Sequence, residues 1–491
     1  MTLGTLLMII GVAAIILTLL ATFTTDRLQN KPLSFLQFFA GVLFIVSGAV
    51  KAIDPLGTAY KMQQYFAAFE GVFKPTSFSW LAPVFPWLSQ YSEGFSVGMI
   101  VLEIVLGIAL VIGFLPWLTA WVFLLLVLFF TALTGFTYLT GYVPAEANFF
   151  EFGKWGKYVA ANMKVTDCGC FGDFIKLEPK ISFIKDLVLL VPAIAFVALY
   201  KDMHRLFSSA MRTWISGLSV PALLVYCFSN YVWNLPDVDF RPFREGVNIP
   251  EKKRQELEAM QNVKITAYRL TNKADGRTVE IPFDQFLKEM SQYPSEKWEM
   301  EQIKSAPAIA PTKVSEFEVA NLDGQDVTEE LLSLKGYYFL IIAYHLEGEK
   351  SERKVIVRDT TYVTDTARTA NSIEIMPQMK VVESSRTEAI FSWEEAYQQR
   401  WTQKIVPLAK AAEEEGIKTI AITAYAGKDQ IEDFRNKSGI SFPFLVADDI
   451  LLKTIVRSNP GTLLMKDGTV VKMWHHRQLP DFDEIRGEYI R

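Results

Sequence analysis

Six apolar stretches in the first half of the chain constrain its fold most strongly. A helix needs about 20 apolar residues to cross a bilayer, and every backbone polar group in lipid must be bonded within the helix. The stretches cover residues 3–23, 33–50, 96–115, 117–139, 181–200 and 212–232. The second half has the charge pattern of a soluble domain. We therefore expect an α-helical polytopic membrane domain with six spans, followed by a soluble α/β part.

Basic residues in short loops indicate the orientation, because such loops remain in the cytoplasm. These residues are Arg27 and Lys31 after the first span, and Lys201, Arg205 and Arg212 between the fifth and sixth spans. We expect both loops in the cytoplasm and the 51–95 loop, the 140–180 loop and everything after residue 232 in a periplasm-like space. The first span lacks a preceding basic residue and a small-residue cleavage site, so it is expected to be an anchor. The predicted location is a bacterial inner membrane with a periplasmic C-terminal part.

Two of the three cysteines, Cys168 and Cys170, stand one residue apart in the stretch TDCGCFGDF of the 140–180 loop. Disulfides form and persist in an oxidising compartment. Zinc normally takes four Cys or His ligands, and this loop has two cysteines and no histidine, so no metal is expected. A bridge across one residue would close a small, strained ring, which favours a reactive pair over a structural one. Two unpaired thiols under a glycine-rich turn remain the alternative, and Cys227 is expected to be a buried apolar residue.

Ionisable residues in or beside the spans predict a polar site, since such residues usually face a bundle interior. They are Glu103 in the third span, Lys185 and Asp186 in the fifth, and Lys51 and Asp54 at the end of the second. The predicted orientation gathers them at one level with the cysteine pair. Either Lys185 or Lys51 could pair with Glu103 and leave an ion-paired pocket under the cysteine loop. Alternatively, the lysines extend to the interface and Glu103 hydrogen-bonds a neighbouring helix.

Three segments resemble the DoxX/MauE group of four-helix, redox-associated membrane proteins. They are LFIVSGAVKAIDPLGTAYKMQQYF (43–66), the span with Glu103, and DCGCFGDFIKLEPKISFIKDLVLL (167–190). The resemblance covers about residues 32–200, and its most specific part runs from Cys168 to Asp173 with Lys185-Asp186 behind it. It implies a four-helix bundle linked to disulfide or quinone-type redox chemistry, with a quinone as the candidate cofactor. We expect Lys51, Asp54 and Asp173 to belong to the binding site.

The soluble part divides at SAPAIAPTK (305–313), whose proline and alanine content is typical of a linker. Before it, a charged helix (251–261) and a hairpin (263–281) predict a small α/β unit. After it, strands are expected at 337–344, 418–424 and 442–446, helices at 394–415 and 427–437, and a hairpin at 459–474. This order resembles a thioredoxin-like domain of the TlpA/peroxiredoxin kind, with Pro460 where that fold carries a cis-proline. The expected domains are 1–31 (anchor), 32–200 (bundle), 201–232 (sixth helix), 233–315 and 316–491.

The thioredoxin-like domain lacks the cysteines of a catalyst. After its first central strand the sequence reads AYHLEGEKSERK (343–354), where a catalytic thioredoxin has Cys-x-x-Cys, so this domain cannot exchange thiols. We expect a recognition module that holds a peptide or protein partner beside Pro460, or a module for assembly. His475 and His476 are adjacent on a strand and should point to opposite faces, one exposed and one packed.

Two functions from different classes follow. In the first, Cys168 and Cys170 cycle between dithiol and disulfide and exchange electrons with a partner or a quinone. Glu103 and Lys185 would complete the catalytic site, with the nearby lysine lowering the pKa of one thiol. In the second, the spans anchor a non-enzymatic binding domain that recruits envelope proteins, and the CGC turn is structural. The expected partners are the lipid bilayer and a periplasmic or envelope protein, and the net charge of -5 without a long basic block does not indicate nucleic acid.

Overall fold

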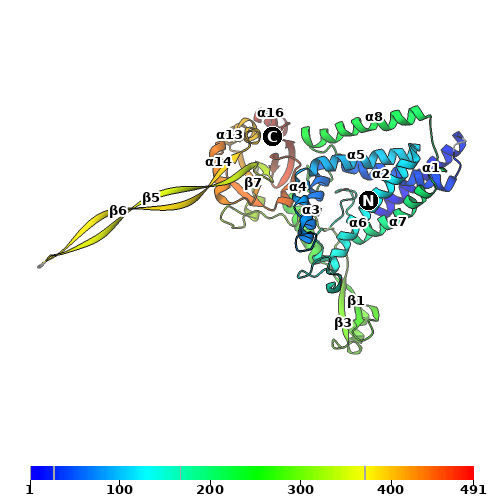
Figure 1. The fold of residues 1–491 in the computed structure, drawn as a ribbon, viewed down its shortest axis with the longest axis horizontal. Coiled ribbons are helices and arrows are strands. Elements are labelled where there is room, and N and C mark those ends of the chain that lie inside the picture. The colour runs from blue at the N-terminus through cyan, green and yellow to red at the C-terminus, as the bar shows by residue number, and fades with distance from the viewer. Residues whose placement is uncertain (1, 26–27, 166, 370–371, 491) are drawn as a thin grey trace. The chain divides into compact units, whose positions relative to one another are not determined.

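The chain forms two compact units, Met1–Arg244 and Glu245–Arg491 (Figure 1). The computed structural model describes residues 2–25, 28–165, 167–369 and 372–490. Arg27, which contributes to the predicted orientation, and Thr166, which begins the cysteine stretch, lie outside the described residues.

Within the described residues, six helices are long and apolar enough to cross a membrane. They are α1 (Leu3–Thr24), α2 (Lys31–Ile53), α5 (Ser92–Ile112), α6 (Pro116–Leu139), α7 (Pro179–Ala198) and α8 (Ser209–Phe228). Side-chain oxygens cap several of their N-termini, as at α2, where the Leu33 backbone N–H donates to Asn30 Oδ1 (3.1 Å). The predicted apolar spans of a multi-pass membrane protein are therefore confirmed.

Two glycines allow a close contact between α2 and α5 in the first unit. A Cβ atom on Gly41 would lie 2.8 Å from the Gly107 carbonyl oxygen, and one on Gly107 would lie 2.7 Å from the Gly41 carbonyl oxygen. Only glycine fits at these positions, so the two backbones approach closely. This contact fixes the position of Glu103 on α5 relative to Lys51 on α2.

The 54–91 segment folds into helices that the sequence analysis did not predict. They are α3 (Pro55–Phe73) and α4 (Val84–Gln90). The Gly57 backbone N–H donates to Asp54 Oδ1 (2.9 Å), so Asp54 caps the start of α3. The Phe69 ring packs 5.6 Å from Phe85 on α4 and 4.8 Å from Phe136 on α6, between ring centroids. These aromatic contacts hold α3 against the bundle at the end where the cysteine loop lies.

The first unit extends further along the chain than the predicted boundary at residue 232. A short helix, η5 (Ser229–Trp233), continues α8. The Phe240 ring then packs 5.0 Å from the ring of Phe174, just after the cysteine stretch. Residues 233–244 therefore belong to the membrane unit.

A small antiparallel sheet with strand order β2-β1-β3 follows helix α9 (Ile249–Gln261). Its strands are β1 (Ile265–Asn272), β2 (Thr278–Pro282) and β3 (Trp298–Lys304), and α10 (Phe283–Glu289) covers it. The predicted helix and hairpin are present, whereas β3 was not predicted. Residues 305–313 form neither helix nor strand.

A five-stranded sheet with the order β10-β9-β4-β7-β8 forms the core of the C-terminal part. Its strands are β4 (Tyr337–Ala343), β7 (Lys418–Ala424), β8 (Phe444–Ala447), β9 (Gly461–Lys466) and β10 (Thr469–His475), and its helices are α11 (Thr328–Leu332), α12 (Glu395–Arg400), α13 (Val406–Glu414), α14 (Lys428–Ser438), α15 (Asp449–Ile455) and α16 (Phe482–Tyr489). Strands β4, β7 and β8 are parallel, and β9 is antiparallel to β4 and β10. Successive β4 residues from Tyr338 to Ala343 are buried, so both sheet faces are covered. The predicted C-terminal α/β sheet is confirmed.

A long two-stranded ribbon interrupts this part of the chain between β4 and α12 (Figure 1). Strands β5 (Gly348–Thr369) and β6 (Ser372–Trp393) pair antiparallel along their whole length. The ribbon begins within the stretch 343–354, where a catalytic thioredoxin would have Cys-x-x-Cys. Its strands were not predicted.

Candidate functional site

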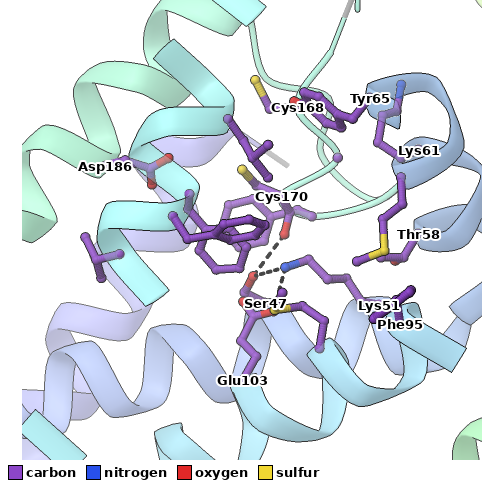
Figure 2. A pocket seen from close by; sticks show the side chains of 18 of the residues that line it. Ser47, Lys51, Thr58, Lys61, Tyr65, Phe95, Glu103, Cys168, Cys170 and Asp186 are labelled. Atoms are coloured by element: carbon purple, nitrogen blue, oxygen red, sulfur yellow. Dashed lines mark hydrogen bonds and ion pairs between the residues drawn. The ribbon is translucent and has the colours of Figure 1, made fainter. Parts of the chain in front are cut away.

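A cavity of about 280 Å³ lies inside the first unit at the cysteine end of the helix bundle. Side chains from α2, α3, α4, α5, α6, α7 and the cysteine turn form its walls. Most of them are aromatic or aliphatic, including Phe44, Phe66, Phe69, Phe95, Phe130 and Leu133. The polar lining residues are Ser47, Lys51, Thr58, Lys61, Glu103, Cys168, Cys170, Lys185 and Asp186. The cavity is therefore largely apolar with a small set of ionisable and thiol groups (Figure 2).

An ion pair between Lys51 and Glu103 lies on one side of the cavity. The Lys51 Nζ donates to Glu103 Oε2 at 2.6 Å, and the two side chains are 7% and 2% exposed. The Lys51 ammonium also lies 5.3 Å from the centroid of the Phe130 ring. Of the two predicted partners for Glu103, Lys51 is the one that the structure places beside it. Removing one member would leave a buried charge, so the two side chains depend on each other.

Ser47 connects this ion pair to the cysteine turn. Its hydroxyl oxygen accepts a hydrogen bond from Lys51 Nζ (3.3 Å) and its hydroxyl donates to the Cys170 carbonyl oxygen (2.9 Å). Figure 2 shows this chain of contacts from Glu103 through Lys51 and Ser47 to Cys170. The turn is therefore anchored to α2 at Cys170.

A second ion pair lies within α7, and a hydrogen bond connects it to α6. Lys185 Nζ lies 2.5 Å from Asp186 Oδ1, and Thr134 donates from its hydroxyl to Asp186 Oδ2 (2.9 Å). Lys185 is the positive charge that acts most strongly on Cys170. The predicted grouping of Lys185 with the cysteine pair therefore holds in the structure.

The cysteine turn depends on two glycines with positive φ angles, Gly169 (φ 64) and Gly172 (φ 51). The Gly169 backbone N–H donates to Asp167 Oδ1 (3.2 Å), and Asp167 forms an ion pair with Lys61 on α3 (3.0 Å). A Cβ atom on Gly169 would lie 3.0 Å from Lys61 Cγ. The residue between the two cysteines is therefore restricted by both backbone conformation and space.

Burial keeps both thiols protonated at neutral pH. It raises the pKa of Cys168 to about 12, and the neighbouring Cys170 thiol and nearby carboxylates act in the same direction. Burial also raises the pKa of Cys170, and the charge of Lys185 opposes this without overcoming it. Lys185 thus lowers the pKa of Cys170 in the predicted direction, but desolvation is the larger effect and the net shift is upward. Both cysteines are free thiols in this structure.

Two further residues at the site, Lys61 and Tyr65, were missed by the sequence analysis. The Tyr65 hydroxyl hydrogen-bonds Thr137 on α6 (2.8 Å), and burial together with the nearby thiols raises the pKa of Tyr65. Thr58, Lys61 and Tyr65 recur at helical spacing on the cavity face of α3. The Asp54-Pro55 helix start, followed by this stripe, was the available sequence signal.

The remaining predicted site residues lie away from the cavity. Asp54 caps α3, and Asp173 pairs with Lys176 (3.6 Å); neither of these described residues lines the cavity. Pro460 belongs to the second unit, where the Asn459–Pro460 peptide bond is cis. Beside it, Arg400 donates to the Asn459 carbonyl oxygen (2.6 Å) and Asn459 Nδ2 donates to Glu347 Oε1 (3.0 Å).

The histidine pair differs from the prediction. The rings of His475 and His476 lie 4.2 Å apart between centroids, and His475 is 3% exposed while His476 is half-buried. Strand β10 ends at His475, so the alternation of a strand does not continue to His476. The expectation that the two rings point to opposite faces is therefore wrong. Burial and the adjacent His475 lower the pKa of His476 to about 3, which keeps its ring neutral.

No family model, curated protein or solved structure matches this chain. Its class is defined by its own geometry: a multi-pass membrane protein in which two free thiols and two buried ion pairs line one apolar cavity.

Proposed function

We propose that the first unit is a membrane thiol-disulfide redox protein of the DoxX/MauE kind. Cys168 and Cys170 would cycle between dithiol and disulfide and exchange two electrons with a protein partner and with a quinone-type molecule. The observation that carries this proposal is that both thiols line a largely apolar cavity next to Lys185. A purely structural turn would not need two thiols at the wall of such a cavity.

The residues around the cavity fit a quinone by size and chemistry. A volume of about 280 Å³ lies just below the range for small-ligand sites, which is about 300–1,000 Å³. Aromatic walls such as Phe66 and Phe130 suit a planar ring, and Ser47, Lys51 and Lys185 supply donors for its oxygens. A bound quinone would accept the two electrons and two protons that a dithiol loses.

In this proposal the buried charged residues have two roles, which are to stabilise a thiolate and to position the cysteine turn. Each thiol loses its proton when a disulfide forms, and Lys185 stabilises negative charge on the Cys170 sulfur during that step. The Lys51–Glu103 pair and Ser47 hold the Cys170 backbone in place. Glu103 is thus a positioning residue in this proposal.

The test is the redox state of the pair in native membranes. Cells that produce a Cys227→Ser variant are quenched with acid, and the denatured protein is alkylated with a mass-adding maleimide before and after reduction. We expect two more labels after reduction. A Cys168→Ser/Cys170→Ser variant should fail to restore the phenotype of cells that lack the protein. Equal labelling in both conditions, or an intact phenotype in the double variant, would contradict the proposal.

We infer a recognition role for the second unit, with a thioredoxin-like arrangement in a periplasm-like space. The supporting features are the strand order β10-β9-β4-β7-β8, the position of Pro460 directly before β9, and the absence of cysteine from residues 245–491. A peptide or protein partner would bind beside Pro460.

A non-enzymatic scaffold is the second candidate function. The raised pKa values of both thiols favour it, because a protonated thiol is a poor nucleophile. Crosslinking with mass spectrometry separates the two functions. A scaffold predicts the same partners for the wild type and the Cys168→Ser/Cys170→Ser variant, whereas the redox proposal predicts that a disulfide-linked partner is lost.

A further inference from the structure

The two cysteines of the turn have different surroundings. Cys170 is surrounded by ionisable groups that all lie in spanning helices, namely Lys51, Glu103, Lys185 and Asp186. The residue after it, Phe171, is 2% exposed and packs in the helix core. Cys170 is thus on the side of the turn that faces the spanning helices, and Figure 2 shows it next to the contacts among Ser47, Lys51 and Glu103.

Cys168 also lines the cavity, and its thiol lies beside Ser182 on α7, but residues near it along the chain are exposed. Its neighbour Asp167 keeps 32% of its side chain exposed in the ion pair with Lys61, and Lys164 before it is exposed. In Figure 2 its sulfur is farther than that of Cys170 from the Lys51–Glu103 pair. Gly169 separates the two sulfurs by a left-handed turn.

The cavity wall itself includes surfaces that face out of the bundle. Phe95 at the start of α5 and Phe129 near the middle of α6 both line the cavity, and both remain exposed, at 44% and 45%. Exposed aromatic side chains on spanning helices contact lipid. Phe95 and Phe129 thus form a part of the cavity wall that is also exposed on the outside of the helix bundle.

We propose that the two thiols are reached from different phases: Cys170 from the bilayer through the opening at Phe95 and Phe129, and Cys168 from the aqueous side. This assignment refines the redox proposal, on which its chemical roles rest. Cys168 exchanges with a water-soluble protein dithiol, and Cys170 reacts with a lipid-soluble two-electron acceptor of the quinone class.

The thiol-exchange step balances with these roles. A thiolate of the partner attacks Cys168 Sγ in the Cys168–Cys170 disulfide, and Cys170 leaves as a thiolate beside Lys185. The second partner thiol attacks the partner sulfur bound to Cys168, which releases Cys168 and closes the partner disulfide. The pair has then gained two electrons and two protons, and passes both to the lipid-soluble acceptor as its own disulfide forms again.

The test compares two alkylating reagents on single-cysteine proteins in proteoliposomes. The proteins are Cys168→Ser/Cys227→Ser and Cys170→Ser/Cys227→Ser, and the reagents are a lipid-soluble N-cyclohexylmaleimide and a membrane-impermeant sulfonated maleimide. The ratio of the two rates cancels the intrinsic reactivity of each thiol. We expect this ratio to be at least about tenfold higher for Cys170, because an apolar reagent concentrates in lipid.

A substitution at the opening provides a second measurement. Phe129→Ala should raise the rate of Cys170 labelling by the lipid-soluble reagent several-fold and leave labelling of Cys168 by the sulfonated reagent unchanged. Leu125→Ala is the matched control, since Leu125 is also exposed on α6 (61%) and does not line the cavity. Neither side chain is buried, so both variants should fold.

The outcomes separate this inference from the redox proposal. Equal or reversed rate ratios for the two cysteines would overturn the phase assignment even if the pair cycles in cells. A higher ratio for Cys170 would support the assignment even if the pair never cycles, because labelling requires no redox partner. Equal effects of Phe129→Ala and Leu125→Ala would overturn the lateral opening.

Discussion

Single residues decide the geometry of the cysteine site. Gly169 combines a φ angle of 64 with a close approach to Lys61, and Lys51 is held by Glu103 on one side and Ser47 on the other. These contacts explain why a glycine separates the two thiols and why charged residues persist in helices that are otherwise apolar. They also make the site sensitive to small substitutions.

Lys51→Met should destabilise the membrane unit by about 3–5 kcal/mol, because it leaves the Glu103 carboxylate buried without its partner. Thermal unfolding in detergent measures the effect. The double variant Lys51→Met/Glu103→Met removes both charges, so its free energy of unfolding should fall much less. A single variant as stable as the wild type would show that the pair is not coupled.

Gly169→Ala should lower the free energy of unfolding by about 1–2 kcal/mol, because alanine is strained in the left-handed backbone conformation. The contact with Lys61 should lower it further. Gly153→Ala in the same loop is the control, because Gly153 has open space around its Cα and no positive φ. We expect a lower unfolding temperature for Gly169→Ala only. The same loss in both variants would contradict the account of the turn.

The raised pKa of Cys168, about 12, predicts an unusual pH dependence of alkylation. In the Cys170→Ser/Cys227→Ser protein, burial still acts on the remaining thiol. Its rate with iodoacetamide should rise about tenfold per pH unit between pH 7 and 10, because the thiolate is the reactive form. A rate that levels off near pH 9, as expected for an ordinary thiol pKa of about 8.5, would contradict the burial of this thiol.

At the scale of elements, the sequence predicts helices and strands that have a clear apolar pattern. It does not predict elements and pairings that depend on tertiary contacts. The six apolar stretches and the strand Tyr337–Ala343 were predicted because their composition alone requires burial. Helix α3 was missed because its cavity face mixes Lys61 with Tyr65 and Phe69, so it lacks a simple apolar stripe. The sequence alone does not decide whether Lys51 or Lys185 pairs with Glu103. The partner depends on how α2 and α5 pack, which Gly41 and Gly107 determine.

The β5–β6 ribbon was missed for a different reason. Its strands of 22 residues are far longer than the usual 3–10 or so, and Pro377 lies inside β6. Its base is tied to the sheet unit where the Trp393 ring packs 4.8 Å from Phe434.

Replacing residues 353–388 with an Asn-Gly turn, which joins the paired residues Glu352 and Ala389, should leave the five-stranded sheet folded. The expected unfolding temperature of the second unit changes by a few degrees at most, because the core residues Trp401 and Phe434 keep their contacts. Calorimetry of the full chain measures it. Trp393→Ala is the comparison that should destabilise the unit, since it removes the contact with Phe434.

At the scale of the whole molecule, the chain combines a membrane unit that carries all three cysteines with a second unit that has none. In the proposed function, electrons pass only through the first unit, and the second unit selects the partner. Because of this division, the proposed redox role of the CGC turn and the proposed recognition role of the five-stranded sheet rest on separate observations.

The most direct test of the central claim is a redox titration of the Cys227→Ser protein in lipid nanodiscs. Samples equilibrated at defined ratios of reduced to oxidised dithiothreitol are quenched with acid, denatured and alkylated. We predict one transition in which Cys168 and Cys170 lose their labels together. The ratio of reduced to oxidised protein should change tenfold per about 30 mV of potential, as a two-electron couple requires. Two labels at every potential would show that the pair does not form a disulfide and would contradict the redox account.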